Sequence, residues 1–187
     1  MVSAGACFLA ALLLLTLPLD YLAAAVIAAA VHEGCHMAAI FLLGGKIHTI
    51  RFGSTGAVLE AQTNGILREL VCAAAGPAGS LSLLLLCHSF PQVALCGLFQ
   101  GLFNLLPVYP MDGGRILNCL LERFLPQKAA AGMQIAQRLT CFVILLLAAA
   151  GTFLFSLGYF PVLAALFLLL QVFSRKIPCK QSQIRVQ

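Results

Sequence analysis

Long apolar runs separated by short polar segments make up most of the chain. The hydrocarbon core of a bilayer is about 30 Å thick, and a helix needs about 20 apolar residues to cross it. Six runs approach this length, which predicts an all-α integral membrane protein with about six transmembrane helices. These runs are residues 1–19, 21–43, 67–88, 93–108, 135–157 and 159–174.

Composition supports the membrane assignment. The chain is 61% hydrophobic and 9% charged, with a mean hydropathy of +1.02, whereas soluble domains are about 45–50% apolar. The first run has the alternative of a secretory signal, but no Lys or Arg precedes its apolar stretch, so we favour a retained helix. None of the eight cysteines forms a C-x-x-C pair, and no disulfide framework is implied.

The net charge of +5 is concentrated on one side of the predicted membrane plan. With six spans, segments 44–66, 109–134 and 175–187 share one face, and all eleven Lys and Arg lie in them or at the adjoining helix ends. Basic loops face the cytoplasm, so both termini are predicted to be cytoplasmic. The orientation of the chain in the bilayer thus accounts for the positive charge, which argues against a nucleic-acid partner.

We expect one membrane domain over residues 1–187, because no linker or repeat divides the chain. Segment 44–64 departs from the apolar pattern: "KIHTIRF" and "AVLEAQ" are joined by "GSTG". This pattern predicts a small cytoplasmic β-hairpin between the second and third helices, with an irregular loop as the alternative. The stretch "AAAGPAGS" in the third run favours close helix packing over a direct chemical role.

The sequence "HEGCH", residues 32–36, places ionisable side chains within an apolar run. On a helix His32 and His36 lie about 40° apart and one turn along, so both imidazoles face one point, as two metal ligands do. Glu33 can take a proton from a water at that metal. If this motif occurred by chance, the protein would still carry a charged group inside the membrane, which costs at least about 2.5–3.5 kcal/mol.

A catalytic zinc site usually has three protein ligands and a water, so a third ligand is required. The fourth run ends as a helix near Leu106, before Pro107, and about 21 Å of helix does not cross a 30 Å core. The following "PVYPMD" then lies at membrane depth, which predicts that Asp112 reaches the level of the histidines. The alternative is that Asp112 caps a helix beginning at Gly113 or Gly114.

Asn104 lies in the fourth run, where a buried amide requires a hydrogen-bond partner. Directed at the metal, it would stabilise an oxyanion or position the substrate backbone. The alternative is an interhelical hydrogen bond.

Two segments together, "HEGCH" and "NLLPVYPMDGGR", resemble the paired signature of the site-2 protease family of intramembrane zinc metalloproteases, H-E-x-x-H and N-x-x-P-x-x-x-x-D-G. The resemblance covers residues 21 to about 125. The six-span plan and the short insert are similar to stage IV sporulation protein FB-like members of the family.

The resemblance implies one Zn²⁺ held by His32, His36 and Asp112, with Glu33 as the catalytic base and Asn104 contacting substrate or oxyanion. It implies a transmembrane or membrane-tethered protein substrate, such as a sporulation sigma factor precursor, a regulatory membrane protein, and a bacterial cytoplasmic membrane. Three features depart from the family pattern. We expect no PDZ-sized insert between the second and third spans, and no C-terminal nucleotide-sensing domain of the kind that the sporulation members carry. The segment "GPAGS" also lacks the asparagine that some family members place after Gly-Pro.

Two further classes of function are considered. One is a catalytically silent membrane protein that binds metal or a client helix, although binding alone does not need Glu33. The other is an ion transporter, but the polar residues form one cluster and not a chain across the bilayer.

Overall fold

The computed structural model describes residues 18–53, 56–62, 65–109, 111–155 and 166. The predicted first and sixth spans, 1–19 and 159–174, therefore lie almost entirely outside the described residues. The chain divides into two compact units, Met1–Leu106 and Pro107–Gln187. Each unit is described by itself, and a single domain over the whole chain stays a prediction.

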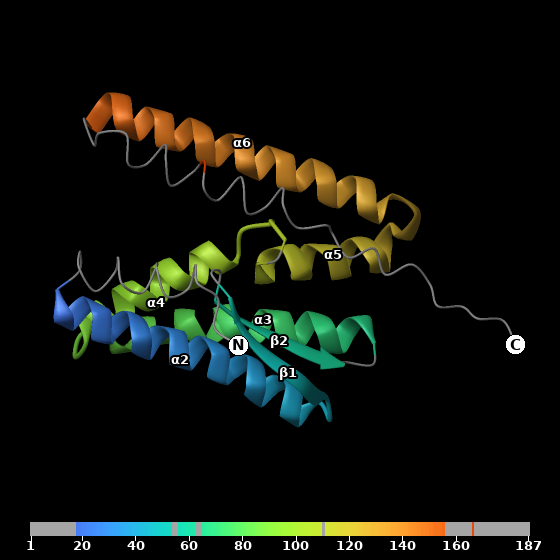
Figure 1. Cartoon of the computed structure of the whole chain (residues 1–187), viewed down its shortest axis with the longest axis horizontal. Coiled ribbons are helices and arrows are strands. Elements are labelled where there is room, and N and C mark those ends of the chain that lie inside the picture. The colour runs from blue at the N-terminus through green and yellow to red at the C-terminus, as the bar shows by residue number, and fades with distance from the viewer. Residues whose placement is uncertain (1–17, 54–55, 63–64, 110, 156–165, 167–187) are drawn as a thin grey trace, which may run out of the picture. The chain divides into compact units, whose positions relative to one another are not determined.

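In the described part of the first unit, three helices pack against one another (Figure 1). They are α2, Leu19–Leu42; α3, Ile66–Ser82, which continues as the 3-10 turn η1, Leu83–Leu86; and α4, Pro91–Asn104. Small side chains lie where these helices meet, among them Ala28 and Ala73, both 0% exposed. Without a hydrophobic driving force between helices in lipid, such close van der Waals contact is what holds them together.

A two-stranded antiparallel sheet follows α2 (Figure 1). Strand β1, Lys46–Gly53, pairs with β2, Gly56–Gln62, and the register shifts between Ile47 and Thr49. The chain leaves α2 through Gly44, whose φ of +69° lies in the left-handed region. Glycine adopts this conformation without a Cβ penalty and commonly ends helices in this way.

Helix α4 is short. It has 14 residues, which at 1.5 Å per residue spans about 21 Å. It ends at Asn104, with Leu105 as its C-cap, and not at Leu106 as predicted from Pro107. The fourth of the six predicted spans, 93–108, is therefore not a helix of full membrane length.

The second unit contains helices α5, Asp112–Phe124, and α6, Ala129–Phe155, joined by the short 3-10 turn η2, Pro126–Lys128. The helix that the sequence placed after Asp112 is present as α5, which contacts α6. Val108, 2% exposed, packs with Cys141 of α6 and with Met111.

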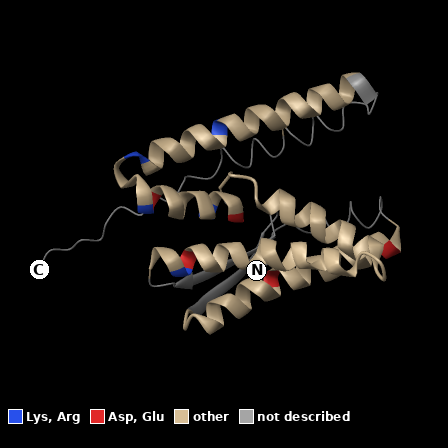
Figure 2. Ribbon diagram, turned by 180° about the vertical axis from the view of Figure 1, so that it is seen from behind, with Lys and Arg blue, Asp and Glu red and all other residues tan. Residues whose placement is uncertain are grey.

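Three described stretches are long and apolar enough to cross a membrane: Leu19–Leu42, Ile66–Leu86 and Pro126–Phe153. Their outward residues include large apolar side chains such as Phe41, 81% exposed, and Phe153, 92% exposed, which suit lipid contact and not water. Helix α4 contains no charged residue, and α2 contains only Asp20 and Glu33 (Figure 2). The protein is thus mostly helical and integral to a membrane. Among the described residues, three of the six predicted spans are helices long enough to cross a membrane.

Candidate metal centre

Helix α2 buries one residue per turn along a single stripe. Residues spaced by four share a helix face, and the stripe ends in two imidazoles and an isoleucine. His32 is 3% exposed and His36 is 6% exposed. The stripe consists of Ala24, Ala28, His32, His36 and Ile40.

The two imidazoles meet through corresponding nitrogens. The Nε2 atoms of His32 and His36 are 3.2 Å apart, and the ring centroids are 4.8 Å apart with the ring planes nearly perpendicular, at 84°. Two histidine nitrogens that each bind a tetrahedral zinc at about 2.0–2.1 Å lie about 3.3 Å from each other. The observed pair therefore fits two ligands of one ion without rearrangement.

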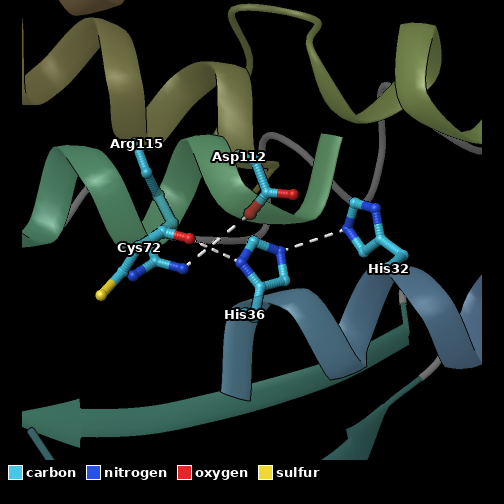
Figure 3. A network of polar contacts seen from close by, with 5 residues as sticks. All are labelled: His32, His36, Cys72, Asp112 and Arg115. Atoms are coloured by element: carbon cyan, nitrogen blue, oxygen red, sulfur yellow. Dashed lines mark hydrogen bonds and ion pairs between the residues drawn. The ribbon is translucent and has the colours of Figure 1, made fainter. Parts of the chain in front are cut away.

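Helix α3 holds both rings by their other nitrogens. The Nδ1 of His36 lies 2.7 Å from the backbone carbonyl oxygen of Cys72, and the Nδ1 of His32 lies 2.8 Å from the Ser80 hydroxyl. Figure 3 shows His36 between the Cys72 oxygen and His32. Because a carbonyl only accepts, His36 donates its Nδ1–H, and a neutral ring then presents its Nε2 lone pair. Ligating histidines are typically held in this way.

Glycines in α3 make this approach possible. A Cβ on Gly76 would collide with the His36 imidazole, and one on Gly79 would collide with the Cys35 thiol. The close-packing interpretation of "AAAGPAGS" is confirmed by these contacts. Pro77 lies inside α3, which continues past it to Ser82. Cys35 thus packs on Gly79.

Glu33 is on α2, directly after His32, and is half-buried. It lies one position off the buried stripe, so its carboxylate is carried on the same rigid helix as both imidazoles. Its role as a base stays a prediction.

Asn104 is the last residue of α4 and is half-buried. Its side-chain amide donates to the Gln100 carbonyl of its own helix, 3.1 Å away. In that bond the amide nitrogen is the donor. The acceptor lies within α4, so the bond is neither the substrate contact nor the interhelical hydrogen bond considered from the sequence. The predicted contact of Asn104 with substrate or oxyanion stays a prediction.

Asp112 belongs to the second unit and is 7% exposed. It is the first residue of α5, whose N-cap is Met111, with no side-chain capping bond. The alternative that Asp112 caps this helix is therefore wrong. Its carboxylate lies 3.9 Å from the Arg115 guanidinium, one turn along (Figure 3). The helix N-terminus also favours a negative charge there.

The backbone before α5 approaches the helix closely at Gly114. A Cβ on Gly114 would lie 2.6 Å from the carbonyl carbon of Val108 and 2.7 Å from the Tyr109 nitrogen. Only glycine allows the chain to fold back so tightly. The close backbone approach thus explains why the second glycine of "DGG", Gly114, is needed.

Sequence reasoning did not identify the two groups of α3 that hold the imidazoles. One face of α3 carries residues spaced by four along the sequence: Cys72, Gly76 and Ser80. This face presents the Cys72 carbonyl and the Ser80 hydroxyl, and Gly76 between them has no side chain. That spacing was the available signal for Ser80. A backbone carbonyl such as that of Cys72 has no signature in sequence.

Comparison with known proteins agrees with the geometry. Residues 70–149 match the family model of peptidase family M50; this range includes Asn104 and Asp112 but not His32 to His36. No curated protein sequence matches the chain. The fold is similar to that of the site-2 protease from Methanocaldococcus jannaschii, with a TM-score of 0.59, 23% identity, and coverage of 92% of this chain and 87% of that one. Residues 70–149 are thus similar in sequence to peptidase family M50, and the fold of the chain is similar to that of a site-2 protease.

Proposed function

We propose that this protein is an intramembrane zinc metalloendopeptidase that cleaves transmembrane or membrane-tethered proteins. The observation that carries the proposal is the imidazole pair of α2, with Nε2 atoms 3.2 Å apart and both Nδ1 atoms held by α3. Two buried histidines with fixed rings and facing Nε2 atoms are suited to hold a metal ion. The similarity to peptidase family M50 gives the chemistry that such an ion would serve.

Asp112 is the proposed third ligand. It is buried, as both histidines are, and it lies within the segment that matches the family model. Two imidazoles and one carboxylate form a common ligand set of catalytic zinc, which leaves a fourth position for water. A buried carboxylate gains stability from a nearby cation, because burying a negative charge away from water is costly unless it is compensated.

Glu33 is the proposed general base. Bound zinc would supply Lewis acidity and lower the pKa of a water to about 7. Glu33 takes a proton from the attacking water and then delivers it to the leaving amine, so one water and one peptide bond become a carboxylic acid and an amine. Asn104 is the proposed contact for the substrate carbonyl. Its amide nitrogen carries two N–H donors, and the bond to the Gln100 carbonyl uses one of them, which leaves the other for the substrate.

Access to the site is proposed to come from the cytoplasmic side, where we also propose that both termini lie. Helix α4 is about 9 Å too short to cross a 30 Å core, and irregular backbone at membrane depth must be buried in protein or beside water. A substrate helix hides its carbonyls in internal hydrogen bonds and must unwind before cleavage. A free edge of the β1–β2 sheet could then hold the extended segment by backbone pairing.

The finer parts of the proposal follow from the sequence motifs. The membrane is proposed to be a bacterial cytoplasmic membrane, with a regulatory membrane protein as a further partner and no nucleic acid. A membrane-tethered sporulation sigma factor precursor is the first substrate to test, because the six-span plan is similar to the sporulation members of the site-2 protease family.

The test is cleavage of a transmembrane reporter by purified protein in detergent. Glu33→Gln keeps the size of the side chain but removes the base, so we expect loss of cleavage with zinc content unchanged. Met37→Leu, an exposed position on the same helix, is the matched control and should cleave normally. Retained cleavage in Glu33→Gln would refute the proposed mechanism, and a wild type that binds zinc without cleaving any reporter would favour the silent metal-binding alternative.

A further inference from the structure

We propose that Ser80 is a positioning residue for the His32 imidazole, a role that rests on the proposed metal site. Its hydroxyl lies 2.8 Å from the His32 Nδ1, and the residue is 0% exposed. A fully buried hydroxyl is costly unless it is hydrogen-bonded. Ser80 thus holds the imidazole from α3, on the ring side opposite to Nε2.

The two histidines are held by different chemistry. The Cys72 carbonyl can only accept, which fixes the His36 proton on Nδ1. The Ser80 hydroxyl can accept or donate, so it tolerates either tautomer of His32. When His32 donates Nδ1–H to Ser80, its Nε2 lone pair faces that of His36, as a shared ion requires. When Ser80 donates instead, the His32 proton is on Nε2 and faces His36 across 3.2 Å.

Ser80 therefore determines how readily His32 becomes a metal ligand. Without the hydroxyl, the side chain of residue 80 no longer accepts Nδ1–H, which shifts His32 toward the tautomer whose Nε2–H is bonded to His36. That tautomer cannot bind a metal through Nε2. His36 would keep its own orientation, because the Cys72 carbonyl is unaffected by side-chain substitution.

A second serine in the same helix provides the control. The Ser82 hydroxyl donates to the Gly79 carbonyl, 2.7 Å away, which is the common local use of serine in a membrane helix. Ser80 instead reaches across to α2. Two serines two residues apart thus have separable roles, one between helices and one within its own helix.

The test compares Ser80→Ala with Ser82→Ala in detergent-solubilised full-length protein. Zinc affinity is measured by competition with a chromogenic chelator. Loss of a hydrogen-bond partner of a metal-bound histidine typically costs about 10–100-fold in affinity, and we expect this loss for Ser80→Ala only. The second readout is the ring N–H spectrum of ¹⁵N-histidine-labelled protein at saturating zinc. The His32 Nδ1–H signal should shift in Ser80→Ala while the His36 signal stays in place.

The outcomes separate this inference from the proposed function. Wild-type affinity in Ser80→Ala, or an unmoved His32 signal, would overturn the role of Ser80 and leave the protease proposal intact. A lower melting temperature of the metal-free Ser80→Ala protein with the His32 signal unmoved would assign Ser80 to packing and would also overturn it. A wild-type protein that binds no zinc would instead remove the metal site on which the proposed function depends.

Discussion

Gly76→Ala tests the joint placement of α2 and α3 with a single methyl group. The added Cβ would overlap the ring of His36, a buried side chain held by the Cys72 carbonyl. The imidazole must leave that carbonyl or the two helices must move apart. Either change separates His36 from His32, so both zinc affinity and stability should fall.

The expected magnitude follows from the size of the overlap. Overpacking a tight interior usually costs about 1–3 kcal/mol. If that strain is relieved by displacing the ring, metal affinity falls by about 5–150-fold, since 1.4 kcal/mol is a factor of ten. The measurements are thermal unfolding with and without zinc, and chelator competition for the metal.

Gly34→Ala is the matched control for this substitution. Gly34 is on α2 between the two histidines, and a Cβ there meets nothing within 4 Å. Alanine is a better helix former than glycine by about 1 kcal/mol, so this variant should be at least as stable as wild type and bind zinc equally well. Wild-type zinc affinity in Gly76→Ala would refute the close approach of α3 to His36.

Three further predictions concern the metal and the second unit. Chelation should abolish reporter cleavage and lower the melting temperature, and added zinc should restore both; cleavage that persists in chelator would contradict the proposed chemistry. Gly114→Ala should destabilise the protein by about 1–3 kcal/mol, because its Cβ would meet the backbone of residues 108–109. In the control Gly132→Ala, the Cβ meets only a flexible leucine side chain at 3.3 Å. Equal melting temperatures of the two variants would contradict this prediction. Arg115→Gln should change the free energy of unfolding by less than about 1 kcal/mol, as its 3.9 Å pair with Asp112 is weak; a larger loss in urea titration would show that the pair matters more than its geometry indicates.

Sequence was most informative where a period or a proline determines the backbone. The four-residue spacing of His32 and His36 predicted their common face, and the apolar runs predicted α2, α3 and α6. The short fourth helix followed from Pro107, although α4 ends three residues before that proline.

Contacts between helices were harder to predict from the sequence. The glycines of α3 indicated close packing but not which side chain packs against them, because a glycine shows only that another group comes close. That the partner of Gly76 is the His36 ring depends on the rotation of α2 about its axis, which sequence does not record. The cap assignment of Asp112 failed because the helix begins one residue earlier than the glycines suggested.

The bonds from α3 to the histidines restrict how the molecule can open. Both imidazoles are tied to α3, two turns apart, and Gly76 and Gly79 leave no clearance between the helices. Sliding or rotating α2 along α3 would break both bonds at once. Relative motion of α2 and α3 therefore costs both hydrogen bonds, which favours movement of the two helices as a pair.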